Sequence, residues 1–170
     1  VTLRFNSNYQ TTGAGAQLLL TAIAQPAVCD AGSTAITLAP TQVLPFTTNT
    51  GALYSNNAAC TSTITVPAGY AVGVSVAAAN LENGVDFLTF YDGPNAASPL
   101  LFPAMTGLLI PTIVASSGAA LTIAFASSLT TAFSGVHLEL SALAQRDICA
   151  DQTPITLGPS NLVLSSAALA

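Results

Sequence analysis

Gly135-Val-His-Leu-Glu-Leu140 alternates apolar and polar side chains. Successive side chains of a β-strand point to opposite faces, so this alternation is typical of a strand with one buried face. We therefore expect the valine and both leucines of this stretch to face the protein core. His137 and Glu139 should lie together on the opposite face, which is exposed to solvent.

Similar strand-like runs precede this one along the chain. They are rich in Val, Ile, Thr and Phe, and clusters of Gly, Pro and Asn separate them, as at Pro67-Ala-Gly69 and Asp92-Gly-Pro94. No stretch carries a convincing helical stripe. Many short strands joined by turns predict an all-β fold of two packed sheets. The runs are Thr61–Val66, Tyr70–Val76, Asp86–Tyr91, Leu108–Ile110 and Ala120–Phe125.

The two ends of the chain are copies of one another. Residues 1–29 align without a gap with residues 121–149, with 11 identical positions, and each copy ends in a cysteine. After a deletion of one residue, Ile36–Pro40 matches Ile155–Pro159. An offset of about 120 residues indicates a repeated domain rather than the short unit of a solenoid.

The repeat divides the chain into three parts. Residues 1–28 are expected to be the C-terminal part of a preceding unit, residues 29–148 a complete unit, and residues 149–170 the N-terminal part of a following unit. The segments Ala24–Val28 and Ala144–Ile148 would serve as short linkers. Because such short linkers restrict relative motion, neighbouring units should contact each other in a fixed geometry.

Charge is scarce. Charged residues make up 5% of the chain, the net charge is −5, and Arg4 and Arg146 are the two basic residues. This composition argues against binding to nucleic acid or to anionic lipid, which both require clustered Lys and Arg. A surface with so little charge is poorly protected against association. It could be buried in an assembly or covered by O-linked glycan, for which Ser- and Thr-rich stretches such as Phe46–Thr50 offer acceptors.

High hydropathy does not predict a membrane helix here. No stretch reaches the roughly 20 unbroken apolar residues that such a helix needs. No Asn-x-Ser/Thr sequon occurs, so N-glycosylation is not indicated.

An ordered series of segments between Cys29 and Leu143 resembles the CUB domain family. The resemblance implies a jelly-roll-like antiparallel β-sandwich with an extracellular interaction role, and tandem arrays of such domains agree with the internal repeat. The segments are Cys29, Ile36–Pro40, Tyr54–Cys60, Ile64–Tyr70, Val85–Pro94, Leu121–Ser127 and Phe133–Gly135.

The resemblance also implies how the three cysteines are used. Cys29 would pair with Cys60, and Cys149 would be the first cysteine of the next unit, a candidate for an inter-unit disulfide. Three free, buried cysteines are the alternative. The chain departs from the family at the second disulfide, because Gly84 and Thr106 occupy the positions of those two cysteines.

Calcium binding is the chemistry that the resemblance raises. Many family members hold Ca²⁺ with a Glu, an Asp in the acidic strand and an Asp in a later loop, and Glu82 and Asp86 could supply the first two. Ser128 replaces the third acid. Calcium normally takes 6–8 oxygen ligands with several carboxylates, so we expect no metal and no other cofactor. In the structural alternative, Asp86 accepts backbone N–H groups and Glu82 lies in a solvated loop.

No catalytic constellation is visible. His137 is the one histidine, and its pairing with Glu139 is not preserved in the first copy of the repeat. We therefore expect no enzyme. The leading hypothesis is a head-to-tail structural subunit of an extracellular fibre or matrix, with itself and covalent glycan as partners. The alternative is a secreted recognition module for a protein or carbohydrate ligand.

Overall fold

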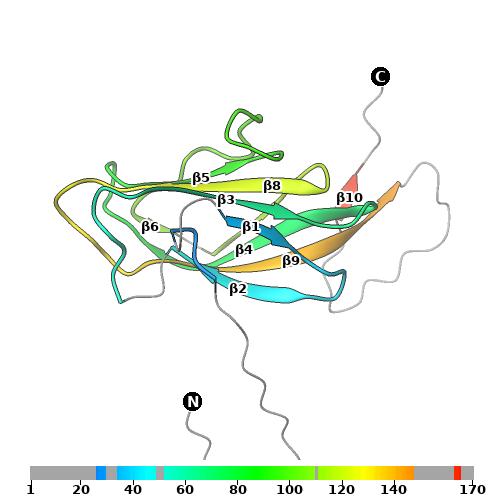
Figure 1. Ribbon diagram of the computed structural model, residues 1–170, viewed down its shortest axis with the longest axis horizontal. Coiled ribbons are helices and arrows are strands. Elements are labelled where there is room, and N and C mark those ends of the chain that lie inside the picture. Colours follow the sequence, from blue (N-terminus) through cyan, green and yellow to red (C-terminus); the bar gives the residue numbers. More distant parts are fainter. Residues whose placement is uncertain (1–25, 30–33, 49–51, 110, 148–162, 166–170) are drawn as a thin grey trace, which may run out of the picture.

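The chain folds as a sandwich of two β-sheets in a computed structural model that describes residues 26–29, 34–48, 52–109, 111–147 and 163–165. Figure 1 shows the two layers one above the other. None of the described residues is helical, so none belongs to a helix that could cross a membrane. The strands are β1 Thr34–Thr37, β2 Val43–Thr47, β3 Ala59–Thr65, β4 Tyr70–Asn80, β5 Phe87–Tyr91, β6 Leu108–Leu109, β7 Thr112–Ala115, β8 Ala120–Ala126, β9 Gly135–Asp147 and β10 Val163–Ser165.

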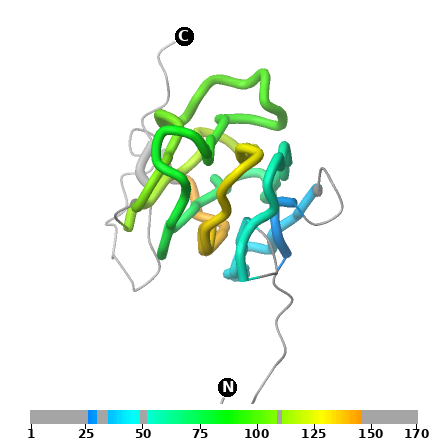
Figure 2. The backbone as a smooth tube through the Cα atoms, turned by 90° about the vertical axis from the view of Figure 1, so that its left-hand side faces the viewer, coloured from blue at the N-terminus to red at the C-terminus, as the bar shows by residue number. Residues whose placement is uncertain are grey.

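One sheet has the strand order β1-β3-β8-β5, and the other has the order β10-β9-β4-β6, with β2 also paired to β9 and β7 also paired to β4. The predicted antiparallel arrangement holds for most pairs, but β1 pairs with β3 and β10 pairs with β9 in parallel. Figure 2 views the sandwich end-on, with the loop that follows β8 in front. The all-β sandwich predicted from the sequence is therefore confirmed.

The alternation along β9 places its side chains as predicted. Val136, Leu138 and Leu140 are buried, whereas His137 and Glu139 are exposed. The buried side chains of both sheets meet in a single cluster, which gains stability roughly in proportion to the apolar area that it removes from water. Its largest fully buried members are Phe46, Phe90, Phe125, Leu38, Ile64, Leu88, Leu121, Ile123, Leu138 and Leu140.

Strand β9 runs further than the sequence predicts. It continues to Asp147, through most of Ala144–Ile148, so this predicted linker is part of the sheet. Ala27 and Val28, at the other predicted linker, are fully buried, and Val28 belongs to the core. The sandwich therefore includes residues on both sides of Cys29, while residues 1–25 and 148–162 lie outside the described part.

Candidate functional site

The loop Leu81–Asp86 connects β4 to β5 and carries the two acids that the sequence singles out. The loop is a tight turn in which the backbone N–H groups of Val85 and Asp86 both donate to the Glu82 carbonyl, at 3.3 and 3.1 Å. Gly84 has a φ of 73°, a conformation that glycine adopts without steric cost. The turn leaves Glu82 half-buried and buries Asp86 completely.

Both carboxylate oxygens of Asp86 accept hydrogen bonds from the protein. The Tyr54 hydroxyl donates to Oδ2, and the Ser128 backbone N–H donates to Oδ1 at 2.7 Å. A buried carboxylate is costly unless such donors replace its water. The structure thus brings together residues from three loops that lie far apart in the sequence.

Tyr54 lies at the centre of this arrangement. Its ring packs edge-on against Phe125 with centroids 5.1 Å apart, and its hydroxyl accepts the Glu82 backbone N–H at 3.2 Å. Burial, followed by the hydrogen bond to Asp86, raises the pKa of Tyr54 to about 12. The hydroxyl therefore stays protonated and keeps donating to Asp86 well above neutral pH.

Ser128 closes the cluster from the loop that follows β8. Besides its backbone bond to Asp86, its hydroxyl donates to Glu82 Oε2 at 2.9 Å. We call Tyr54, Glu82, Asp86 and Ser128 the Ser128 cluster. The structure brings Glu82, Asp86 and Ser128 together, the three positions to which the family resemblance directs attention.

The cluster does not fit a calcium ion. Each carboxylate oxygen of Asp86 already accepts a hydrogen bond from the protein. Ser128 supplies no charge at the position where a third acid would be needed. Among the described residues, no group of three or more His, Cys, Asp or Glu side chains is arranged to hold a metal. The four residues instead form a hydrogen-bonded network that joins three loops.

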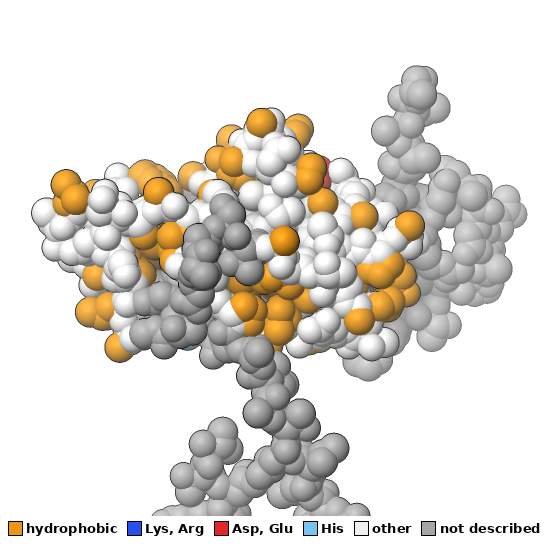
Figure 3. Space-filling view, viewed as in Figure 1, with side chains coloured by type: hydrophobic (Ala, Val, Ile, Leu, Met, Phe, Trp, Pro, Cys, Tyr) orange, Lys and Arg blue, Asp and Glu red, His pale blue; other side chains and the backbone are white. Residues whose placement is uncertain are grey.

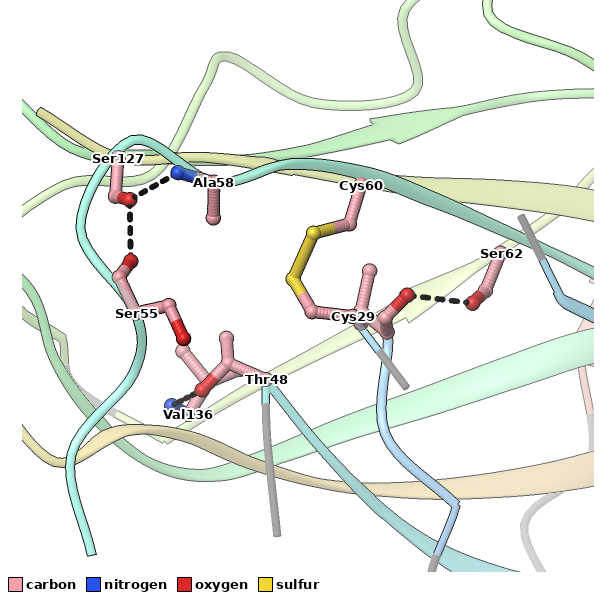
Figure 4. The surroundings of a disulfide bond; sticks show 9 residues. Cys29, Thr48, Ser55, Ala58, Cys60, Ser62, Ser127 and Val136 are labelled. Atoms are coloured by element: carbon pink, nitrogen blue, oxygen red, sulfur yellow. Dashed lines mark hydrogen bonds between the residues drawn. A yellow bond between two sulfur atoms is a disulfide. The ribbon is translucent and has the colours of Figure 1, made fainter. Parts of the chain in front are cut away.

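Cys29 and Cys60 form a disulfide near this end of the sandwich (Figure 4), the pair that the resemblance implies, with Cα atoms 5.1 Å apart. It ties the segment before β1 to β3. Close by, the Ser127 hydroxyl accepts from the Ala58 N–H at 2.9 Å and donates to the Ser55 carbonyl at 2.7 Å. Cys149, the candidate for an inter-unit disulfide, lies outside the described residues.

Hydrogen bonds join the two positions where the family's second disulfide is missing. The Gly84 N–H donates to the Thr106 hydroxyl oxygen at 2.7 Å, and this hydroxyl donates to the Glu82 carbonyl at 3.0 Å. The Leu81 N–H also donates to the Gly107 carbonyl at 3.0 Å. Thr106 therefore binds the backbone of the same loop whose carboxylates Ser128 binds.

Other residues singled out by the sequence lie elsewhere. His137 and Glu139 are on the exposed face of β9, and neither takes part in the Ser128 cluster. Within Phe46–Thr50, Thr47 and Thr48 are buried, and the Thr48 hydroxyl accepts the Val136 N–H at 3.3 Å (Figure 4). These two hydroxyls are therefore not glycan acceptors.

Three exposed apolar side chains adjoin the cluster in sequence. Leu53 precedes Tyr54, Val85 precedes Asp86 and Leu129 follows Ser128; they are 57%, 46% and 73% exposed. The cluster brings the backbone of all three loops together, so the three apolar residues lie at one end of the sandwich. On the face drawn in Figure 3, orange side chains are frequent, also at this end, and charged ones are rare.

Comparison with known proteins agrees with this architecture. The family model of the CUB domain matches residues 39–140. The full extracellular region of zebrafish Gpr126/Adgrg6 is similar at a TM-score of 0.55 and 21% identity, over 65% of this chain and 14% of that one. The CUB1-EGF-CUB2 domain of human MASP-1/3 is similar at 0.53 and 19%, over 64% of this chain and 40% of that one. The MASP-1 CUB2 domain bound to Ca²⁺ is similar at 0.52 and 18%, over 66% of this chain and 99% of that one.

Proposed function

Because this chain belongs to the CUB domain family, we propose that it is a non-catalytic module of an extracellular protein and that it binds another protein. The proposed contact surface, which we call the loop end, is the end of the sandwich that carries the Ser128 cluster. Its apolar contacts are Leu53, Val85 and Leu129. The observation that carries this proposal is that hydrogen bonds within the Ser128 cluster hold three loops with exposed apolar residues together.

The cluster supports a binding role better than a catalytic one. Asp86 is completely buried and both its oxygens accept hydrogen bonds from the protein, so its carboxylate is not exposed to a substrate. Tyr54, with its raised pKa, is a poor proton donor at neutral pH. The four residues are positioned to fix loop geometry, and pre-ordered loops lower the entropic cost of binding.

The composition supports an apolar contact. With charged residues at 5% of the chain, electrostatic steering is weak, and burial of exposed Leu and Val is the main driving force available. Leucine side chains that remain 57% and 73% exposed still have most of their surface to bury. The expected partner surface is accordingly apolar and of low charge.

The second candidate function is a self-assembling subunit of an extracellular fibre or matrix, in which the partner is another copy of the same unit. The scarcity of charge favours it, because little like-charge repulsion opposes packing of copies. Glycan on exposed hydroxyls such as Thr41 and Thr130 would be compatible with either function.

A photo-crosslinking amino acid at position 129 tests both candidates. Its matched control replaces Ile113, which is 65% exposed on strand β7 and lies outside the three loops of the cluster. In the native extracellular setting, an adduct to a different protein from position 129 alone supports the recognition module, and an adduct to a second copy supports the fibre subunit. Adducts from position 113 alone, or none from position 129, would overturn the assignment of the contact surface.

A further inference from the structure

Strand β9 is much longer than strand β2, which pairs with one of its two edges. It has 13 residues, whereas β2 has 5 and pairs only with positions His137 to Ser141. The remainder of this edge, residues 142–147, therefore extends beyond β2. An unpaired strand edge is a ready acceptor for another strand.

Strand β10 occupies the end of this edge (Figure 1). It pairs with β9 in parallel, with Val163 opposite Gln145 and Ser165 opposite Asp147. Strands β2 and β10 thus pair with successive segments of β9. Their directions differ, because β2 pairs with β9 in antiparallel fashion.

The internal repeat identifies β10 as the counterpart of β2. Ile155–Pro159 matches Ile36–Pro40, and the same spacing places Val163–Ser165 on Leu44–Phe46. The repeat thus predicts that the strand that covers the end of β9 belongs to a following unit that begins at Cys149.

The first copy of the repeat shows a similar pairing at its own junction. The Val28 N–H donates to the Thr47 carbonyl at 2.9 Å, and the Thr47 N–H donates to the Pro26 carbonyl at 3.3 Å, which makes a parallel bridge between Ala27 and Thr47. In the repeat, Ala27 corresponds to Asp147. In both junctions the pairing is parallel, and it joins the end of β9, or its counterpart in the first copy, to β2 or its counterpart β10. The two registers differ by one residue.

We infer that consecutive units of this chain are joined by strand addition: the end of one unit's β9 accepts, in parallel, the following unit's counterpart of β2. The partner of this edge is the next copy of the repeat. A strand shared by two sheets restricts the angle between units far more than a flexible linker does. This inference does not depend on the loop-end contact surface proposed above.

The chain carries a natural probe of this junction. Arg4 and Arg146 are the two basic residues, so trypsin has one cleavage site near the N-terminus and one within the paired end of β9. A protease cleaves a chain only after local opening, so pairing on both edges of β9 should protect the Arg146–Asp147 bond.

The amides of Gln145 and Arg146 point to opposite edges of β9, so amide exchange at the two residues reports on different contacts. The Gln145 N–H donates to the Gly69 carbonyl at 2.9 Å, on the side of β4. Successive residues of a strand present their backbone groups to opposite edges, so the Arg146 groups face β10. The amide of Gln145 therefore reports on the sandwich itself, and the amide of Arg146 reports on the junction.

The test compares the full chain with Ser165→Pro, which removes an N–H from β10, and with Ala168→Pro as the matched control beyond β10. We expect trypsin to cleave native Ser165→Pro at Arg146 at least about tenfold faster than the unmodified chain and the control. Amide exchange at Arg146 should accelerate in parallel, while Gln145 stays protected and shows that the sandwich is intact. Equal cleavage rates with equal Arg146 exchange, or rapid Arg146 exchange in the unmodified chain, would overturn the inference.

Discussion

Ser128 donates its backbone N–H to Asp86 Oδ1 over 2.7 Å, although 42 positions separate the two residues in the sequence. The Ser128 hydroxyl also reaches Glu82 Oε2 at 2.9 Å. The small, neutral residue Ser128 thus donates one hydrogen bond to each of the two carboxylates in the loop between β4 and β5. These hydrogen bonds join the loops at this end of the sandwich, and they have consequences for metal dependence, pH dependence and stability.

Calcium should not stabilise the unmodified chain, because the Ser128 cluster contains only two acids and a calcium site normally needs several carboxylates. Replacing Ser128 with Asp adds a third carboxylate beside Glu82 and Asp86. We expect Ser128→Asp to unfold at a lower temperature in chelator, because three close carboxylates repel each other, and to recover when calcium is added. Thermal unfolding followed by circular dichroism, with calcium and with chelator, measures both effects.

Leu129→Asp is the matched control for that experiment. It adds the same charge one residue away, at an exposed position outside the cluster. Its unfolding temperature should not respond to calcium. A similar calcium response in Leu129→Asp, or a response of the unmodified chain, would contradict the assignment of Ser128 as the residue that excludes the metal.

The raised pKa of Tyr54 predicts a loss of stability at high pH. Folding favours the protonated hydroxyl, so its contribution is fully present below the ordinary pKa of 10.0 and is lost as the pH rises toward about 12. Tyr54→Phe should cost about 1–3 kcal/mol at neutral pH, because buried Asp86 loses a donor. Urea unfolding should then show a smaller decline between pH 10 and 12 in the variant than in the unmodified chain. An equal decline in both would show that other groups cause it.

Thr106 should stabilise the loop that lacks the second disulfide. Thr106→Val keeps the shape of the side chain but removes the hydroxyl that links Gly84 to Glu82. We expect a loss of about 1 kcal/mol in the free energy of unfolding and faster amide exchange at Gly84. Thr41→Val, at an exposed position, is the control and should change neither quantity.

The Cys29–Cys60 disulfide closes a loop with a sequence separation of 31 residues. Replacing both cysteines with Ser should lower the free energy of unfolding by about 3 kcal/mol, mainly by freeing the unfolded chain. Chemical denaturation of the double variant measures this loss. A variant as stable as the parent chain would mean that packing of Val28 already fixes this segment.

Much of the fold follows from local sequence. Period-2 alternation within β9 correctly predicts which of its side chains are buried, because a strand has only two faces. The strands that sequence reasoning missed, such as β2 and β7, are short and carry little alternation of their own. The extension of β9 through the predicted linker was also missed. Its residues 144–147 are held as a strand by pairing with β4 and β10, and partners distant in sequence leave no local signal.

The candidate site was predictable only in part. The family pattern directs attention to Glu82, Asp86 and the Ser at position 128, and the change from acid to Ser predicts that metal binding is weakened. Nothing in the sequence assigns Tyr54 as the donor to Asp86 or Thr106 as the substitute for a disulfide. Hydroxyl residues are common in this chain, and their partners are decided by which loops the sandwich brings together.

By itself, then, the sequence determined the strand character of the chain, its scarcity of charge, its repeat and its family pattern, because these depend on residue type and spacing. Only the tertiary structure decided what the polar residues do. A hydrogen bond requires two groups within about 3 Å, whatever their separation along the chain. The Ser128 cluster and the paired end of β9 both depend on contacts of that kind.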